Sequence, residues 1–451
     1  MKNKTTNNTL LPILGNLGGD CSLALKSLWS RRKRNVWLFL ELILVTILCW
    51  AVLDPVIVSI YDKCIPPGYD VDRLCLVTLD KTDNIERSFE ENNQNINGLK
   101  QKLMHDFPEI EQIAISAGYL PTTSTYATMT FYSDTIQSEE TTMRLSRIES
   151  YPGNPIFSTF GIKLIAGNMT TEELDSGLWT NEGLLISRSV AEQYFGSPKD
   201  AMGKYLHLTD WHTNTIDPNL KRRIIGVVEN IKVKSFCRNQ NFVLECPRWA
   251  LTGAPNLIVR LKEGKSINKF HDKIASRIRE GYGSGHLELT KVQTMSDLNK
   301  EREFSFGYTG VVQTYAILAV LFLANLCLGV IGTFWLQTKQ RRGEVGIMRS
   351  FGATRGGIVR LILGEATILT TASFIIGCFI YLQYALKEGL YLGILAGNID
   401  EGTTWVSDFS QHFIITSAIV YAVILTTVLI GAYIPAHSLS RIPPVEALRA
   451  S

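Results

Sequence analysis

The sequence predicts an α-helical membrane protein with four transmembrane helices and one large α+β domain outside the membrane. Four apolar runs in the 451 residues are each long enough to cross a bilayer of about 30 Å as a helix. A long polar segment, 54–310, follows the first run. The mean hydropathy of +0.08 averages these two unlike parts, which explains why it lies above zero in a chain with so much polar sequence.

The four apolar runs favour membrane spans over buried core helices, because one run of this length could be core but four in one chain are typical of a membrane protein. The first run is too long for the apolar part of a signal peptide and lacks a small-residue cleavage site, so we expect a retained anchor. Its one acidic residue, Glu41, can snorkel or be neutralised, and Glu365 lies near the start of the third run. The predicted spans are 36–53, 311–336, 361–386 and 413–434.

The charges that flank the runs predict the orientation. The segments 1–35, 337–360 and 435–451 together carry 15 Lys or Arg and 3 Asp or Glu, whereas the 387–412 loop is mainly acidic. Because basic flanks remain in the cytoplasm, we expect both termini inside, with 54–310 and 387–412 outside. The 1–35 segment is then a cytoplasmic amphipathic segment, 337–360 a cytoplasmic loop and 435–451 a cytoplasmic tail. The predicted localisation is the inner membrane of a bacterium, as a multi-pass protein.

The external segment has two strand–helix–strand patterns, one at each end, which we expect to pack together as one α+β lobe. Between them, residues 121–249 show short β-rich runs broken by Gly, Pro and Asn, and we expect these to form a mostly β lobe inserted into the first. The predicted elements of the α+β lobe are strands at 73–79, 110–116, 256–261 and 287–292 and helices at 96–106 and 266–279. The runs of the inserted lobe include 126–132, 184–187 and 223–229.

Four cysteines lie in the external segment, and an even number outside the cytoplasm permits disulfides in three connectivities. Short loops favour the pairs Cys64–Cys75 and Cys237–Cys246. The alternative, that some of them are free buried thiols, is left open by the sequence. Their spacing is not that of a zinc site, and we predict no metal.

No catalytic motif is found in the sequence. Between Gly196 and Lys204 the spacing is too long for a phosphate-binding loop, and Tyr205 follows where Ser or Thr is needed. Gly264-Lys265-Ser266 has Val259 at the position of the required upstream glycine. We therefore expect a non-catalytic chain without a cofactor of its own. With 45 Lys+Arg against 42 Asp+Glu, the charge balance also argues against a nucleic-acid partner.

A short amphipathic helix is predicted in the loop between the second and third spans. Val345, Met348 and Gly352 would share a face, and Gly352 could end the helix. Such a helix could lie on the membrane or fill a groove on a cytoplasmic protein, and spacing leaves both open. The candidate interaction residues are Glu344, Val345, Gly346, Ile347, Met348, Arg349, Ser350, Phe351 and Gly352.

This loop carries a family resemblance. Residues 343–366, GEVGIMRSFGATRGGIVRLILGEA, resemble the signature of ABC transporter permeases of the MacB/FtsX type, also called type VII. The tail at 443–449, PPVEALR, is similar to the ending of the same family. Gly343 stands where a basic residue is common and Ser350 where Ala is common, and both departures leave the pattern intact. Weaker similarities to the MacB-like periplasmic core domain lie at 161–167, 191–196 and 225–229.

The resemblance implies a mechanism and partners. The external domain would have a porter-like lobe and a β-rich lobe, and the helix near Glu344–Ala353 would dock on a separate cytoplasmic ATPase that binds ATP and magnesium. The permease would work as a homo- or heterodimer in the lipid bilayer and transmit motion to the periplasm (mechanotransmission), in efflux or export. The resemblance is also compatible with a periplasmic adaptor and an outer-membrane channel as further partners.

Two alternatives to an efflux permease remain. Within the family, the chain could be a lipoprotein-releasing or envelope-regulating FtsX-like permease. From another class, a membrane sensor is disfavoured, since the longest cytoplasmic segment is about 35 residues and contains no effector domain.

Overall fold

The computed structural model describes residues 32–441, apart from gaps at 86, 117–118, 124–126, 135–137, 139–140, 150, 182, 210–215, 239, 246–255 and 394–403. The chain divides into two compact units. One contains residues up to Val58, Val311–Tyr391 and residues from Asp408. The other contains Ser59–Gly310 and Leu392–Ser407.

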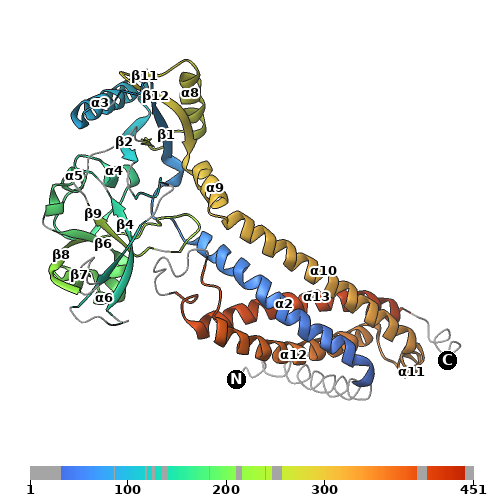
Figure 1. Cartoon of the computed structure of the whole chain (residues 1–451). Helices are drawn as coiled ribbons and strands as arrows, with labels where there is room; N and C mark the ends of the chain where they lie inside the picture. Colours follow the sequence, from blue (N-terminus) through green and yellow to red (C-terminus); the bar gives the residue numbers. More distant parts are fainter. Residues whose placement is uncertain are drawn as a thin grey trace, which may run out of the picture. The chain divides into compact units, whose positions relative to one another are not determined.

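The first unit consists of long apolar helices (Figure 1), and four of them are long and apolar enough to cross a membrane. This confirms the predicted four-helix membrane part. Each helix continues beyond its predicted span at both ends. The helices are α2 (Arg32–Cys64), α10 (Tyr308–Gln340), α12 (Arg355–Glu388) and α13 (Phe409–Ser440), with the short α11 (Arg342–Ser350) between α10 and α12.

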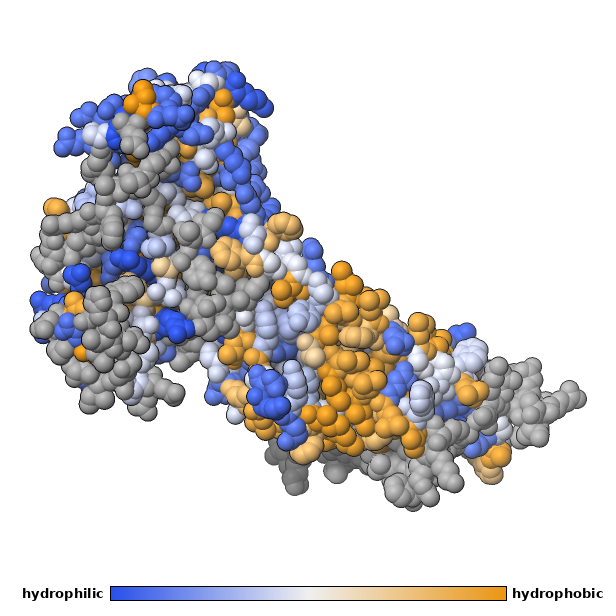
Figure 2. Space-filling model, in the orientation of Figure 1, coloured by the Kyte–Doolittle hydropathy of each residue, from blue (hydrophilic) through white to orange (hydrophobic). Residues whose placement is uncertain are grey.

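Small residues let these helices approach closely. A Cβ on Gly377 of α12 would lie 2.8 Å from the Thr46 side chain of α2, and one on Gly431 of α13 would lie 3.0 Å from Val330 of α10. Close backbone approach through small residues is the usual way in which membrane helices associate. The outward faces remain apolar, and Figure 2 shows hydrophobic side chains gathered over the long helices.

The second unit contains the predicted α+β lobe. Its strands are β1 (Leu74–Lys81), β2 (Ile110–Ser116), β10 (Asn256–Leu261) and β12 (Leu287–Thr294), all antiparallel in the order β12-β1-β10-β2, with the two-residue β11 (Gly283–Ser284) at the edge. Helices α3 (Phe89–Asp106) and α8 (Ile267–Arg279) supply Leu99, Leu103, Phe270 and Ile274 to the core beside the sheet. This arrangement is a split βαβ, or ferredoxin-like, fold.

The inserted lobe lies between β2 and β10 in the chain, as predicted. Its seven strands run in the order β5-β8-β6-β9-β4-β3-β7, and β7 also pairs with β8, so that the sheet closes on itself. A closed sheet leaves few exposed strand edges. The strands are β3 (Thr128–Tyr132), β4 (Thr142–Glu149), β5 (Leu164–Ala166), β6 (Leu184–Ser187), β7 (Tyr205–Thr209), β8 (Ile216–Val228) and β9 (Phe242–Glu245).

Short helices complete the inserted lobe and connect it to the rest of the unit. They are α4 (Ile156–Phe160), α5 (Thr171–Ser176), α6 (Arg188–Phe195) and α7 (Pro198–Ala201), with the 3-10 turn η2 (Leu178–Asn181). A shared core that includes Leu76, Ala114, Phe157 and Phe242 joins the two lobes. The predicted porter-like lobe with an inserted β-rich lobe is therefore confirmed.

Candidate functional site

Helix α11 lies where the amphipathic helix was predicted. Its C-terminal turn is closed by backbone hydrogen bonds from Phe351 N to Ile347 O (3.1 Å) and from Ala353 N to Met348 O (3.0 Å). Gly352 has a φ of 92°, a conformation that residues with a side chain rarely adopt. The prediction that Gly352 ends the helix is confirmed. Thr354 then caps α12 by accepting a hydrogen bond from Gly357 N.

The apolar residues of α11 differ in their exposure. Val345 is only 5% exposed and joins the core of the membrane helices. Met348 is 38% exposed, Ile347 50% and Phe351 88%. Val345 and Met348 are three residues apart on one helix and lie on the same side of it, but their exposure differs, because α11 buries Val345 against its neighbours and leaves Met348 partly exposed. We call Glu344, Ile347, Met348 and Phe351 the α11 surface.

Arg341 fixes the start of α11 to α12. Its Nη1 lies 2.7 Å from Glu365 Oε2 and its Nη2 2.9 Å from Glu365 Oε1, and both residues are buried. Arg341 Nε also lies 3.6 Å from Glu344 Oε2 on the α11 surface. Two parallel hydrogen bonds between a guanidinium and a carboxylate hold both groups in one plane, so this pair restricts rotation as well as separation. Sequence reasoning noted Glu365 without finding its partner.

Other residues predicted to contact a partner make contacts inside the chain. Arg349 is half-buried, and its Nη1 donates to the Ser440 carbonyl oxygen of α13 at 3.4 Å. The hydroxyl of Ser350 donates to Ile347 O at 2.7 Å. Gly346 is buried. The tail motif at 443–449 lies outside the described residues.

A second buried polar cluster joins α2 to α13. Asp54 Oδ1 lies 2.7 Å from His412 Nε2 and 3.4 Å from Thr416 Oγ1, and Asp54 Oδ2 accepts from Tyr391 N at 3.3 Å. One turn earlier on α2, the Trp50 ring stacks on Tyr381 with ring centroids 4.4 Å apart. Ionisable side chains inside an apolar helix bundle are costly unless paired, so this cluster ties the two helices together.

In the second unit, the segment 231–238 holds the end of α2. Lys232 Nζ donates to the carbonyl oxygens of Asp62, Ile65 and Ser235 at 2.6, 3.1 and 3.0 Å. Arg238 Nη1 pairs with Asp62 Oδ1 at 3.1 Å, and its Nη2 donates to Leu392 O. All these contacts lie in one unit, and two buried cations thus fix the chain where it leaves α2.

Two neighbouring strands continue directly into membrane helices. After α2, the 3-10 turn η1 (Val71–Arg73) leads into β1, and after β12 the helix α9 (Met295–Ser305) leads into α10. Strands β1 and β12 are hydrogen-bonded partners along most of their length. The chain therefore connects both helices to the same sheet.

The predicted disulfide Cys64–Cys75 is wrong. Cys64 is exposed at the end of α2, whereas Cys75 is buried in β1 beside α3 and α8, and neither takes part in a disulfide. The alternation of a strand explains the error, because β1 turns Cys75 into the core. Cys237 is buried, and Cys246 lies outside the described residues, so the pair Cys237–Cys246 stays a prediction. In the described part of the chain, no group of three or more His, Cys, Asp or Glu side chains is placed to hold a metal ion.

The sequence matches the model of the FtsX-like permease C-terminal family over residues 316–444. It is 24% identical over 198 residues to an uncharacterised ABC transporter permease of Methanocaldococcus jannaschii, which covers 42% of this chain and 45% of the relative. It is also 24% identical over 307 residues to the macrolide export ATP-binding/permease protein MacB 1 of Yersinia pestis, covering 65% of this chain and 41% of that protein.

Among solved structures, the periplasmic region of MacB from Actinobacillus actinomycetemcomitans aligns with 52% of this chain and 94% of its own, at 14% identity and a TM-score of 0.29. The chain spans less than half the length of the two curated relatives described above.

Proposed function

We propose that this chain is an ABC transporter permease of the MacB/FtsX type and that it couples ATP hydrolysis in a separate ATPase subunit to conformational work outside the cytoplasm. The observation that carries the proposal is the α11 surface. A short helix presents Ile347, Met348 and Phe351 to the outside while Val345 and Arg341 hold it to the bundle. Exposed apolar side chains on a rigidly held helix are typical of a docking site for another protein.

The route of the motion follows the contacts of α11. A push on this helix would reach α12 through the Arg341–Glu365 pair and α13 through the Arg349 contact with Ser440. It would reach α10 through the chain itself. Helix α10 has 33 residues, which is about 50 Å of rigid rod, and the chain continues from it through Gly307 and α9 to β12. The work done would be mechanical, in efflux or export.

The basic residues that flank the helices support the proposed orientation in the membrane. They favour both termini and α11 on the cytoplasmic side and the two-lobed unit outside. ATP and magnesium would bind the partner ATPase. A second permease would cover part of the apolar face of α10, where Ile317, Val320 and Leu328 are exposed. A periplasmic adaptor and an outer-membrane channel could complete such a complex.

The proposal is tested by recovering the native complex in mild detergent and measuring how much ATPase chain remains with the permease. The double variant Met348→Asp/Phe351→Asp should lose most of that chain, because two charges replace the apolar contacts. Leu178→Asp is the control, since Leu178 is an exposed apolar residue, at 72%, but lies in the other unit. If the double variant recovers as much ATPase chain as wild type does, the proposal is wrong.

A further inference from the structure

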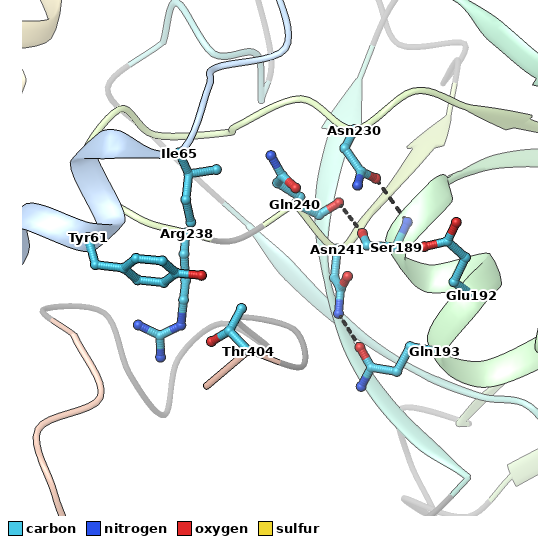
Figure 3. Close-up of a pocket in the computed structure, with 10 residues that line it drawn as sticks. All are labelled: Tyr61, Ile65, Ser189, Glu192, Gln193, Asn230, Arg238, Gln240, Asn241 and Thr404. Carbon is cyan, nitrogen blue, oxygen red and sulfur yellow. Dashed lines mark hydrogen bonds between the residues drawn. The ribbon is translucent and has the colours of Figure 1, made fainter. Parts of the chain in front are cut away.

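A polar cavity of about 420 Å³ lies in the two-lobed unit, beside the segment that holds the end of α2. Its volume is within the range of small-molecule sites. Figure 3 shows two groups of side chains across it. Tyr61, Ile65, Arg238 and Thr404 form one side, and residues of α6 and of the loops around Asn230 and Asn241 form the other. All of them belong to one compact unit.

The second side is a fixed frame of amides. Asn230 Oδ1 accepts from Ser189 N at 2.9 Å, and Gln193 Oε1 accepts from Asn241 Nδ2 at 3.0 Å. The Ser189 hydroxyl donates to Gln240 O at 2.8 Å. These bonds use the oxygens of Asn230 and Gln193 and orient their amide nitrogens, which make no hydrogen bond to the described residues. The side-chain amide of Gln240 has no such bond either, so three amides are available to a ligand.

The charges of the cavity are nearly balanced. Arg238 is buried and paired with Asp62 at 3.1 Å, and its Nη2 donates to Leu392 O. Glu192 lies exposed at the opening and makes no ion pair with any described side chain. An anionic ligand would therefore meet a carboxylate and find no free cation, which disfavours phosphates and nucleotides. A neutral ligand has no such penalty.

We propose that this cavity binds a neutral sugar of one or two rings. A sugar hydroxyl both donates and accepts, which suits side-chain amides and a carboxylate that together offer both functions in a small space. The Tyr61 ring gives the apolar side of a sugar ring a surface to lie against. This inference stands apart from the ATPase proposal, because it concerns binding by the two-lobed unit.

The test uses the full chain in lipid nanodiscs and saturation-transfer NMR with cellobiose and N,N′-diacetylchitobiose as probes and glycylglycine as the competing class. We expect at least one disaccharide to bind with a Kd of about 1 mM or tighter. Gln193→Ala and Gln240→Ala should each weaken binding at least about fivefold, since each removes hydrogen bonds to the ligand. Gln101→Ala, an exposed glutamine on α3, is the matched control and should bind like wild type.

Two results would overturn the inference. One is the absence of saturation transfer to both sugars at 10-fold higher concentration, or transfer to glycylglycine alone, which would assign the cavity to peptides. The other is sugar binding that neither pocket variant changes, which would place the site elsewhere on the protein. Thermal unfolding midpoints equal to wild type establish that each variant is folded, and using two variants keeps the test decisive if one of them is not.

Discussion

The guanidinium of Arg341 and the carboxylate of Glu365 form a bidentate ion pair, with both N–O distances below 3 Å and both side chains buried. Arg341 immediately precedes α11, and Glu365 lies three turns into α12. The pair therefore fixes the angle between the short exposed helix and a long membrane helix. Removing one partner of a buried pair costs much more than replacing both, because a lone buried charge remains.

Glu365→Ala should destabilise the protein by about 3–5 kcal/mol, since it leaves the Arg341 guanidinium buried without its counter-charge. The double variant Arg341→Met/Glu365→Leu should recover most of that loss. Thermal unfolding in detergent measures both. Glu388→Ala, at the exposed end of the same helix, should change stability by less than about 0.5 kcal/mol. A single and a double variant of equal stability would contradict the role given to the pair.

His412 should be needed to satisfy the buried Asp54 carboxylate. Among the described residues, the Asp54 carboxylate of His412→Ala keeps the Thr416 hydroxyl and the Tyr391 amide as partners, so we expect a loss of stability of about 3 kcal/mol. His412→Gln retains a hydrogen-bond donor at nearly the same place, so its loss of stability should be clearly smaller than that of His412→Ala. The measurement is the unfolding midpoint of the detergent-solubilised chain. Equal losses for the alanine and glutamine variants would contradict the role given to this hydrogen bond.

Much of the fold could be predicted because its determinants are local. The β-like run at 110–116 forms β2 with those bounds, and the helix after Ser266 begins where Ser266 accepts a hydrogen bond from Lys269 N. The insertion of one lobe into another followed from the order of such patterns along the chain. The closing of the inserted sheet did not, because the pairing of β7 with β3 joins residues far apart in sequence.

In the candidate site, too, local features could be predicted from the sequence, whereas those that depend on packing between distant segments could not. The position and end of α11 follow from Gly352 and its neighbours, but the division between buried Val345 and exposed Met348 depends on where α12 and α13 pack. The partner of Glu365 was also hidden, since Arg341 looked like one of several flanking basic residues. An acidic residue inside an apolar helix is the signal that could have prompted a search for a basic partner.

The thiols of Cys64 and Cys75 should react at very different rates. Burial, with the nearby charge of Asp297 as a second cause, raises the pKa of Cys75 to about 12, so almost no thiolate is present near neutral pH. Iodoacetamide should label Cys64 in the native protein and Cys75 only after unfolding, as mass spectrometry of peptides would report. A Cys64–Cys75 linked peptide under non-reducing conditions would contradict this assignment.

Lys234 should make stability rise with pH above neutrality. Its Nζ donates to Thr123 O at 2.6 Å, and burial, with the charge of Arg302 as a second cause, lowers its pKa from 10.5 to about 7. Between those values the unfolded chain holds a proton on this lysine that the folded chain has lost. Stability from this group therefore increases with pH over that window, by up to about 1.4 kcal/mol per pH unit.

The variant Lys234→Met isolates this effect. The methionine loses the hydrogen bond to Thr123 at every pH, so the difference in stability between variant and wild type has a constant part. The difference also has a part that depends on pH. As the pH rises from 7 toward 10, wild type should become more stable relative to the variant, because only wild type is relieved of the cost of a buried charge. Unfolding midpoints at several pH values measure it. Lys269→Met, at an exposed position of α8, should give a difference that stays flat, because its charge is solvated in both states. A flat difference for Lys234→Met as well would mean that this lysine is equally protonated in the folded and unfolded chain.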